Sequence, residues 1–320
     1  MMIGASTADS LYKELMWHLY TNARVEETRN GEVMTVPRPV VAALWNPMQR
    51  IVFSPSRDAN PFFHVAETVW MFAGSNDVRF IEQFNKRYRE YADTGTTHVW
   101  GAYGHRWIYR WGFDQIQQAI DLLIKNPVSR QVVINMWDPE RDLTEAPHND
   151  RPCNTQLMFR ALEGGTLDMT VINRSNDLVW GMMGANIVHM TYVHELVARA
   201  AGLNIGTYYV VTNNLHMYTG MPRFQEIFEG GLHGTASGEQ WFTVPILLPK
   251  ETWADLNGDC YDYVDCGVMG NFRTNWFRNT AFPMMEAYLA GPSSERRNDM
   301  MLQIEDPGWR TACAQWVARR

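Results

Sequence analysis

The chain has few cysteines and no long apolar segment. Its four cysteines, Cys153, Cys260, Cys266 and Cys313, are spread over 320 residues without a CxxC pair, which excludes a disulfide framework and a thiolate zinc site. No window approaches 18 uninterrupted apolar residues, so we expect no membrane-spanning helix. No basic stretch followed by an apolar run opens the sequence, so no signal peptide is expected. These absences predict a soluble protein of the cytoplasm.

Basic charge is also in the minority. The chain holds 28 Lys and Arg against 35 Asp and Glu, a formal net charge of -7, which argues against a general nucleic-acid or membrane-surface binder. A local arginine cluster for a small anion remains compatible with this balance. The hydrophobic share of 46% excludes wholesale disorder. Thirteen Trp, 13 Tyr and 14 Phe either fill a large core or line a ligand cleft or a subunit interface.

Apolar periodicity predicts a mixture of helices and strands. Helices are expected from the caps at 6–9 to about residue 20, and at 61–72, 77–91, 114–125, 187–201 and 216–229. Strands are expected at 33–45, 50–54, 130–137, 155–160, 167–173 and 207–212, with a hairpin turn at Gly164-Gly165. This mixture is typical of an α+β fold. We expect a single domain, 1–320, in which residues 230–320 form a divergent C-terminal extension.

Reactive side chains concentrate on short connectors in the middle third. Cys153 lies between a polar loop and a strand, where the neighbouring Arg151 favours a thiolate; an ordinary buried thiol is the alternative. Arg174 and Ser175 close an apolar strand and suit a phosphate, or form a solvated turn. Glu67 is the single acid of an apolar helix, and an unpaired buried carboxylate is usually retained for function.

Three further side chains lie at junctions between elements. Asn186 opens the long helix after a glycine-rich turn, either as an N-cap or as a ligand-binding amide. His216 and Tyr218 lie where a predicted strand meets a predicted helix, and each is structural or functional. None of these residues decides the function singly, whereas their order and spacing do.

That order resembles the thymidylate synthase family, which includes the pyrimidine-nucleotide hydroxymethylases. Family members carry a Pro-Cys nucleophile, an Arg-Ser-x-Asp strand end, a Gly-rich turn to Asn or Asp, and a His-x-Tyr some thirty residues later. The corresponding residues are Pro152-Cys153, Arg174-Ser175-Asn176-Asp177, Gly181 to Asn186, and His216-Met217-Tyr218. Segments 66–74, 101–107, 127–131 and 29–31 match the family's Glu-bearing helix, Tyr-Gly-x-x-Trp motif, arginine loop and mobile phosphate arginine.

The resemblance implies a one-carbon transfer without a metal. The Cys153 thiolate would add to carbon 6 of a pyrimidine, so that carbon 5 attacks the one-carbon unit of 5,10-methylenetetrahydrofolate. Arg174 is expected to lower the pKa of that thiol. Glu67 would act through ordered water as general acid/base, helped by Tyr103 and His216.

The resemblance also implies the ligands of both substrates. The 5′-phosphate would be held by Arg29, Arg130, Arg174 and Ser175, the sugar by His216 and Tyr218, the base by Asn186, and the folate by Asp177, Tyr88 and Trp70. In the family, the position of Arg130 comes from the partner subunit. We therefore expect a homodimer that uses a sheet face, with no nucleic-acid or membrane partner.

Several departures from a standard synthase bear on the reaction. Gln131 and Asn154 stand where most synthases have Arg and His, and Tyr88 aligns with a tryptophan that shields the one-carbon intermediate. Residues 316–320 do not resemble the apolar tail that closes over the synthase site. A wetter site favours addition of water over hydride transfer. The sequence therefore favours a hydroxymethylase of the phage type, acting in a host cytoplasm if phage-encoded, with thymidylate synthase as the alternative.

The base is a separate question. An Asn both donates and accepts, which suits the O4 and N3–H edge of uracil, so Asn186 favours dUMP. The Asn176 neighbour and the one-residue insertion before Asn186 leave dCMP open. A non-catalytic nucleotide-binding relative is the alternative of another class, and the retained Cys153, Glu67 and Asp177 argue against it.

Overall fold

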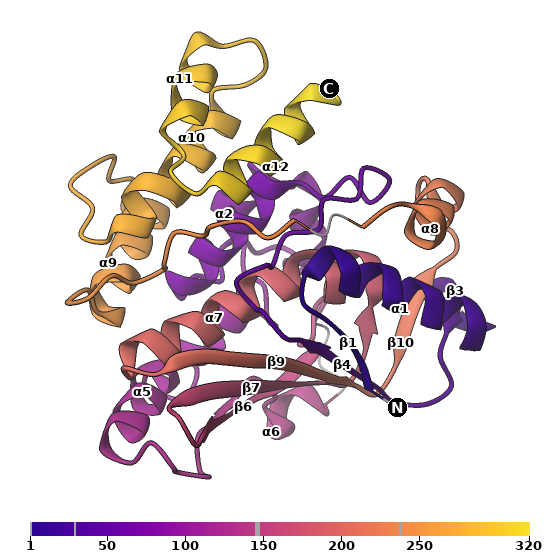
Figure 1. Ribbon diagram of the computed structural model, residues 1–320, viewed down its shortest axis with the longest axis horizontal. Helices are drawn as coiled ribbons and strands as arrows, with labels where there is room; N and C mark the ends of the chain where they lie inside the picture. Colours follow the sequence, from indigo (N-terminus) through magenta and orange to yellow (C-terminus); the bar gives the residue numbers. More distant parts are fainter. Residues whose placement is uncertain (1, 29, 145–147, 237–238) are drawn as a thin grey trace.

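The computed structural model describes residues 2–28, 30–144, 148–236 and 239–320 (Figure 1). Its strands are β1 (Met2–Ala5), β2 (Arg24–Thr28), β3 (Gly31–Thr35), β4 (Val40–Leu44), β5 (Val133–Asn135), β6 (Asn154–Leu162), β7 (Thr166–Asn173), β8 (Asn176–Asp177), β9 (Asn204–Thr212) and β10 (Leu215–Tyr218). Helices and strands are interleaved along the chain, and the expected α+β class is confirmed.

Helices cover the sheets and build the C-terminal third of the chain. They are α1 (Ala8–Asn22), α2 (Pro61–Phe72), α3 (Val78–Ile81), α4 (Tyr103–Ile108), α5 (Gln115–Lys125), α6 (Pro139–Asp142), α7 (Ile187–Ala200), α8 (Phe224–His233), α9 (Trp253–Val264), α10 (Phe282–Leu289), α11 (Glu295–Gln303) and α12 (Pro307–Ala318). A 3-10 helix, η1 (Lys86–Tyr91), and two π-helical segments, η2 (Leu178–Asn186) and η3 (Phe277–Ala281), complete them.

The larger of the two sheets is mixed and has six strands, in the order β1-β4-β9-β7-β6-β5. Inward side chains of β7 such as Leu167, Met169 and Val171 are fully buried, whereas the residues between them are half-exposed. This period of two is what a strand with one covered face requires. β6 and β7 meet in the predicted hairpin, where Gly164 and Gly165 adopt φ of 91° and 76°.

A smaller sheet lies at the end of the large one, in the order β2-β3-β10-β8. β8 and β10 are parallel, with Leu215 beside Asn176 and His216 beside Asp177. β10 also pairs antiparallel with β3, so residues near the N-terminus contact a motif far along the chain.

The helices stack in layers above one face of the large sheet (Figure 1). α7 lies directly on β7 and β9, α2 packs on α7, and α9, α10 and α12 pack on α2 as the outermost layer. α2 begins where it does because the Asn60 side chain accepts the N–H groups of Phe62 and Phe63 and Pro61 occupies the first turn. The resulting core runs without interruption from Leu11 of α1 to Trp316 of α12.

α2 and α4 touch backbone to backbone. A Cβ built on Gly104 would lie 1.9 Å from the Met71 carbonyl oxygen, which leaves no room for any side chain. The approach is possible because the residue is glycine. It places Tyr103, the first residue of α4, beside the helix that carries Glu67.

The opposite face of the large sheet exposes apolar side chains. One lateral row on that face runs through Val133, Met158, Thr170 and Tyr209 on β5, β6, β7 and β9. Val133 is 41% exposed and Met158 is 38% exposed. Apolar side chains are thus left at the surface of a sheet.

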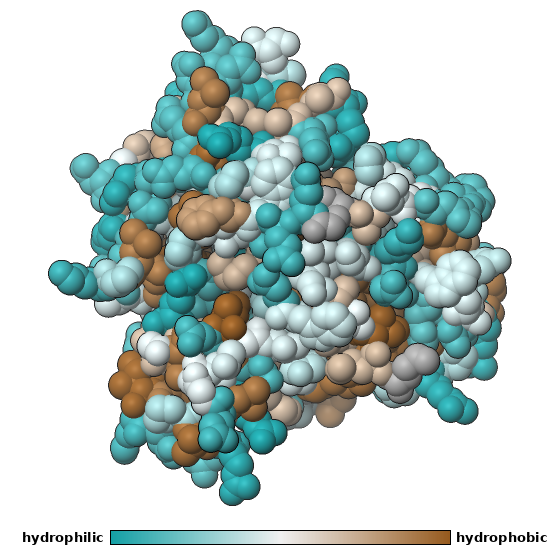
Figure 2. All heavy atoms as spheres, in the orientation of Figure 1, coloured by the Kyte–Doolittle hydropathy of each residue, from teal (hydrophilic) through white to brown (hydrophobic). Residues whose placement is uncertain are grey.

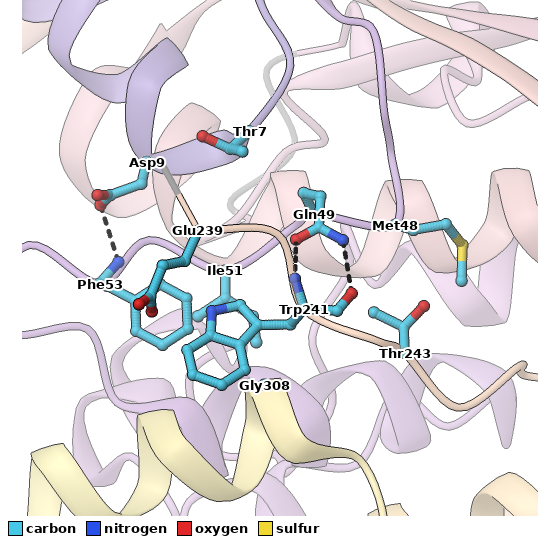
Figure 3. A pocket seen from close by; sticks show the side chains of 10 residues that line it. All are labelled: Thr7, Asp9, Met48, Gln49, Ile51, Phe53, Glu239, Trp241, Thr243 and Gly308. Atoms are coloured by element: carbon cyan, nitrogen blue, oxygen red, sulfur yellow. Dashed lines mark hydrogen bonds between the residues drawn. The ribbon is translucent and has the colours of Figure 1, made fainter. Parts of the chain in front are cut away.

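Residues beyond 238 pack against the N-terminal segments. The Gln49 side chain donates to the Trp241 carbonyl and accepts the Trp241 N–H, both at 2.9 Å. Figure 3 shows this pair at a pocket that Thr7, Ile51, Phe53, Trp241 and Gly308 help to line. Further on, Arg319 and Arg320 at the end of α12 contact the Asp58 carboxylate at 3.1 and 2.8 Å.

Most predicted elements are confirmed, but four are wrong. The expected strand at 33–45 is divided into β3 and β4, which belong to different sheets. The expected helix at 77–91 is divided into α3 and η1, because Asn85 caps a new start by accepting the Arg87 N–H. Residues 216–218 belong to β10 instead of a helix, which begins only at Phe224. Residues 50–54 form no strand. None of the described helices is long and apolar enough to cross a bilayer.

Candidate active site

Cys153 lies immediately before β6, and a tyrosine holds its backbone in place. The Tyr103 hydroxyl accepts the N–H of Cys153 at 3.1 Å and the N–H of Asn154 at 3.2 Å. Burial raises the pKa of the Tyr103 phenol, so the hydroxyl remains protonated. Two residues that the sequence separates by fifty positions are therefore joined at the predicted nucleophile.

Arg174 lies on the other side of Cys153. Its backbone N–H donates to the Cys153 carbonyl at 2.9 Å, and its guanidinium donates to the carbonyls of Pro152 and Arg151 at 2.9 and 3.0 Å. Burial raises the pKa of the Cys153 thiol above its ordinary value, and the positive charge of Arg174 offsets this only in part. The expectation that the arginine lowers the thiol pKa is thus correct in direction, but burial outweighs it.

Asp150 adds to the elevation of the thiol pKa. A Cβ on Gly101 would lie 2.2 Å from its Oδ2 and 3.1 Å from the Pro152 nitrogen, so the carboxyl packs directly against the segment that leads into Tyr103. Desolvation raises the pKa of Asp150 to about 6, against the opposing charges of Arg106 and Arg174. This half-buried acid, whose charge acts on Cys153, was not predicted from the sequence.

Glu67 is 5% exposed on α2 and has two neighbours of its own. The Tyr88 hydroxyl donates to its Oε1 at 2.5 Å, and Nδ1 of His189 on α7 lies 3.6 Å from its Oε2. The His189 ring in turn lies 6.1 Å from the Tyr103 ring, centroid to centroid. His189 thus lies between Glu67 and Tyr103, the residue that holds the Cys153 backbone.

His216 and Asp177 lie side by side in the small sheet. The Asn214 side chain joins this pair to the strand end, because its Oδ1 contacts His216 Nδ1 at 2.9 Å and accepts from Ser175 Oγ at 3.3 Å. The same amide donates to Thr35 Oγ1 at 3.2 Å. Asn214 thus orients two predicted substrate ligands at once.

Asp177 has one satisfied and one unsatisfied oxygen. Its Oδ1 caps η2 by accepting the N–H groups of Val179 and Trp180 at 2.9 and 2.6 Å. Its Oδ2 is buried with no hydrogen-bond partner within the described chain. Burial raises the pKa of this carboxyl, while His216 and Arg57 oppose the shift. A buried acceptor without a donor is a place where a ligand N–H fits.

Asn186 does not cap α7. Its backbone is helical (φ -60°, ψ -42°), and its side chain donates to Asn176 Oδ1 at 3.2 Å. A Cβ on Gly181 would lie 2.4 Å from that same oxygen, so the glycine makes room for the amide pair. The structure therefore excludes the N-cap interpretation and leaves the Asn186 amide oriented by Asn176.

The remaining predicted residues are spread around this centre. The Tyr218 ring stacks on Trp180 at 6.2 Å and meets the His216 ring edge-on at 5.2 Å. Trp70 is 1% exposed and donates its indole N–H to the Asp77 carbonyl, so it contacts the site through the Tyr88 ring, 5.5 Å away. Arg130 is exposed on the loop between α5 and β5, and Arg29 lies outside the described residues.

Sequence reasoning thus missed His189, Asp150, Asn214 and Arg57. The guanidinium of Arg57 lies 2.9 Å from where a Cβ on Gly184 would be, and its charge acts on Asp177. Among the described residues there is no group of three or more His, Cys, Asp and Glu side chains that could hold a metal ion. The pocket of Figure 3 contains none of the predicted site residues.

Comparison with known proteins agrees with this geometry. The thymidylate synthase family profile matches residues 10–227. A deoxyuridylate hydroxymethyltransferase of Pseudomonas phage M6 is 36% identical over 96% of this chain and 91% of its own length. Another of that name from Bacillus phage SP01 is 34% identical over 67% of this chain and 57% of the relative. A thymidylate synthase of Haloferax volcanii is 27% identical over 49% and 51%.

The backbone of Cys153 is held by Tyr103, and Glu67 is buried on α2. A cysteine and a buried acid of this kind are suited to group transfer by covalent catalysis. The chain belongs to the thymidylate synthase family and is a one-carbon transferase. The resemblance identified from its motifs is confirmed. The profile ends within α8, whereas the match to the Pseudomonas phage protein covers nearly all of the chain.

Proposed function

We propose that this enzyme transfers a one-carbon unit from 5,10-methylenetetrahydrofolate to carbon 5 of dUMP and releases 5-hydroxymethyl-dUMP. The observation that carries the proposal is the convergence of Cys153, Tyr103 and Arg174 within hydrogen-bonding distance of one backbone segment. Two relatives named deoxyuridylate hydroxymethyltransferase support the nucleotide and the outcome.

The chemistry begins at Cys153. Its thiolate adds to carbon 6 of the pyrimidine, and the negative charge moves onto carbon 5, which then attacks the one-carbon unit. The raised pKa of the resting thiol means that the nucleophile is protonated before substrate arrives. A dianionic phosphate bound to Arg174 would orient the nucleotide, and a base that takes the thiol proton would complete activation.

Folate fits the acceptor side of the site. The unsatisfied Oδ2 of Asp177 is suited to the N–H groups of a pterin ring, which need an acceptor. Tyr88 and the buried Trp70 behind it supply an aromatic wall beside Glu67. We assign Asp177, Tyr88 and Trp70 to the co-substrate on these grounds, with Glu67 as general acid/base.

The nucleotide fits the other side. Arg174 and Ser175 directly follow β7 and offer a guanidinium and a hydroxyl suited to the phosphate, together with Arg29 and a partner's Arg130. His216 and Tyr218 suit the sugar hydroxyl. Asn186, held by Asn176, offers an amide to the O4 and N3–H edge of uracil.

Hydroxymethylation is favoured over methylation by Tyr88. Its hydroxyl donates to Glu67, so a polar group lies where a synthase carries an apolar shield. A polar wall admits water to the one-carbon intermediate. The enzyme then releases tetrahydrofolate, whereas a synthase oxidises it to dihydrofolate.

Mass spectrometry of the product from dUMP and methylenetetrahydrofolate tests the proposal directly. A nucleotide heavier by a hydroxymethyl group, formed without the absorbance of dihydrofolate, is the expected result. Stoichiometric dihydrofolate with dTMP would overturn it in favour of thymidylate synthase. The same assay with dCMP measures the choice of base.

The active form is proposed to be a homodimer. Arg130 is exposed at the β5 edge of the large sheet, and the uncovered sheet face carries Val133 and Met158. Ile124 near the end of α5 and Val128 in the loop that follows are 59% and 77% exposed. Figure 2 shows apolar atoms gathered at the lower left, in the region where Figure 1 places α5. A second copy would cover this apolar surface and supply Arg130 to the neighbouring site.

We further propose that residues 1–320 act as one catalytic domain in the cytoplasm. Residues 230–320 add α9 to α12 to the outer layer over α2, which carries Glu67. Hydroxymethylated pyrimidine nucleotides are precursors of modified bases in phage DNA, which is the role that the phage relatives suggest.

A further inference from the structure

A buried histidine and a buried glutamate face one another with unsatisfied atoms. His189 on α7 is 1% exposed, and its Nδ1 lies 3.6 Å from Glu67 Oε2. Neither ring nitrogen of His189, nor Glu67 Oε2, has a hydrogen-bond partner within the described chain. Leaving three such atoms unpaired costs about 1–3 kcal/mol each. These three atoms therefore need a hydrogen-bond partner that is not a side chain or backbone group of the described chain. A water molecule or a reacting group can serve as that partner.

The pair lies between the groups that hold the reacting atoms. Asn186, assigned to the base, precedes His189 by one helical turn, so both side chains share a face of the helix. On the other side the Tyr103 ring lies 6.1 Å from the imidazole, and its hydroxyl fixes the Cys153 backbone. Water held by His189 would therefore lie between the base and Glu67.

Glu67 is placed to orient the imidazole. Its Oε1 accepts from the Tyr88 hydroxyl, and its Oε2 faces His189 Nδ1. A carboxylate on that side favours the tautomer with the proton on Nδ1 and leaves Nε2 as an acceptor. The 3.6 Å separation is long for a hydrogen bond and is of the kind that shortens when substrate binds.

We propose that His189 is the catalytic base that delivers water to the one-carbon intermediate, an inference that rests on the function proposed above. At that stage carbon 6 is bonded to Cys153 and carbon 5 carries an exocyclic methylene. The water oxygen bonds to the methylene carbon, the π electrons move to carbon 5 and its carbonyl, and the water proton passes to Nε2. The electrons then return and expel the Cys153 thiolate from carbon 6, and the proton leaves the imidazolium for solvent.

The position of this imidazole differs from that in most synthases. Asn154 stands directly after Cys153, at the position where most synthases carry a histidine. This motif therefore supplies no imidazole. α7 supplies one instead, on the far side of the Tyr103 ring. An imidazole can accept a proton from water near neutral pH. Hydride transfer, which completes the reaction of a synthase, needs no such base.

The test separates water addition from the earlier steps. His189→Gln and His189→Ala are compared with the unaltered enzyme in single turnovers with dUMP labelled with tritium at carbon 5 and methylenetetrahydrofolate. Tritium release reports formation of the methylene intermediate and is expected to stay within about threefold of the unaltered enzyme. Formation of 5-hydroxymethyl-dUMP is expected to fall by about 10²–10⁴-fold. Added 2-mercaptoethanol should then trap the methylene as a thioether, and added imidazole should partly restore the product in His189→Ala.

The covalent complex with 5-fluoro-dUMP counts the folded enzyme in each preparation, so loss of folding is not mistaken for loss of water addition. His194→Gln on the same helix is the matched control. His194 Nε2 lies 2.6 Å from the Leu167 carbonyl in the sheet, so its loss should lower Tm without changing the products. Product formation at the original rate in His189→Gln, or equal loss of tritium release and product per folded site, overturns the inference. Failure of the unaltered enzyme to make 5-hydroxymethyl-dUMP instead overturns the proposed function.

Discussion

The Tyr103 hydroxyl accepts the backbone N–H groups of both Cys153 and Asn154, at 3.1 and 3.2 Å. Tyr103 on α4 thereby fixes the position of the Cys153 backbone next to β6. Tyr103→Phe removes the acceptor but keeps the ring. We expect a loss of about 1–3 kcal/mol in unfolding free energy, because two N–H groups lose their partner. Urea unfolding measures this, and a stability equal to that of the unaltered enzyme would contradict it.

The acidity of the Cys153 thiol should depend on two charged neighbours in opposite directions. Arg174 lowers its pKa and Asp150 raises it, while burial keeps the pKa above the ordinary value. Arg174→Gln should therefore raise the thiol pKa further, and Asp150→Asn should lower it. The pH dependence of alkylation by iodoacetamide measures both. Cys266 is also exposed to the reagent, so both variants are made in a Cys266→Ser background. A shift of the Cys153 pKa in the same direction in both variants would contradict the geometry.

Asp150 should destabilise the folded protein at neutral pH. Its pKa is raised to about 6 by burial, so the folded state holds its proton more tightly than the unfolded state, whose value is near 3.8. Ionisation therefore lowers stability as pH rises from about 4 to above 6. Asp150→Asn should gain at most about 3 kcal/mol over the unaltered protein at pH 8 and little at pH 4. A difference that does not change with pH would show that the carboxyl is solvated.

Asn186→Asp should change the preferred base. A carboxyl at this position accepts from the exocyclic amine of cytosine and loses the donor to O4 of uracil. We expect kcat/KM for dUMP to fall about 10–100-fold relative to that for dCMP, in line with one lost hydrogen bond to a buried group. Parallel turnover assays with the two nucleotides give this ratio, and an unchanged ratio would show that Asn186 does not read the base.

A site shared between subunits, as proposed above, predicts subunit complementation. Arg130→Gln and Cys153→Ser should each be nearly inactive as homodimers. A mixed dimer, however, has one site with an intact Cys153 and a partner's intact Arg130. Exchange of subunits in an equal mixture should restore about a quarter of the original activity, since half of the dimers are mixed and each has one good site. No gain on mixing would argue that Arg130 serves its own subunit or none.

The parts of the fold that rest on local signals were predictable from the sequence. Asn60 and Pro61 mark the start of α2, and the two glycines at 164–165 mark the turn of a hairpin. Candidate site residues such as Glu67 and Cys153 could also be found from the sequence. The order of the family motifs identifies them even where apolar periodicity gives no information.

Features that depend on distant partners could not be predicted. Residues 216–218 continue as a strand because β3, more than 180 positions earlier, offers an open edge. His189 reads as an ordinary member of an apolar helix until Glu67 is seen opposite it. The close approach of Asp150 to Gly101, some fifty residues away, is likewise revealed by no local pattern.

α2 and α4 meet where Gly104 leaves no space for a side chain, so neither can shift without the other. α7 begins directly after Asn186, one turn before His189. The residue proposed to read the base and the residue proposed to deliver water thus lie within a single helical turn. A lineage could exchange both properties together through a handful of substitutions in that turn, while the nucleophile and its framework stay untouched.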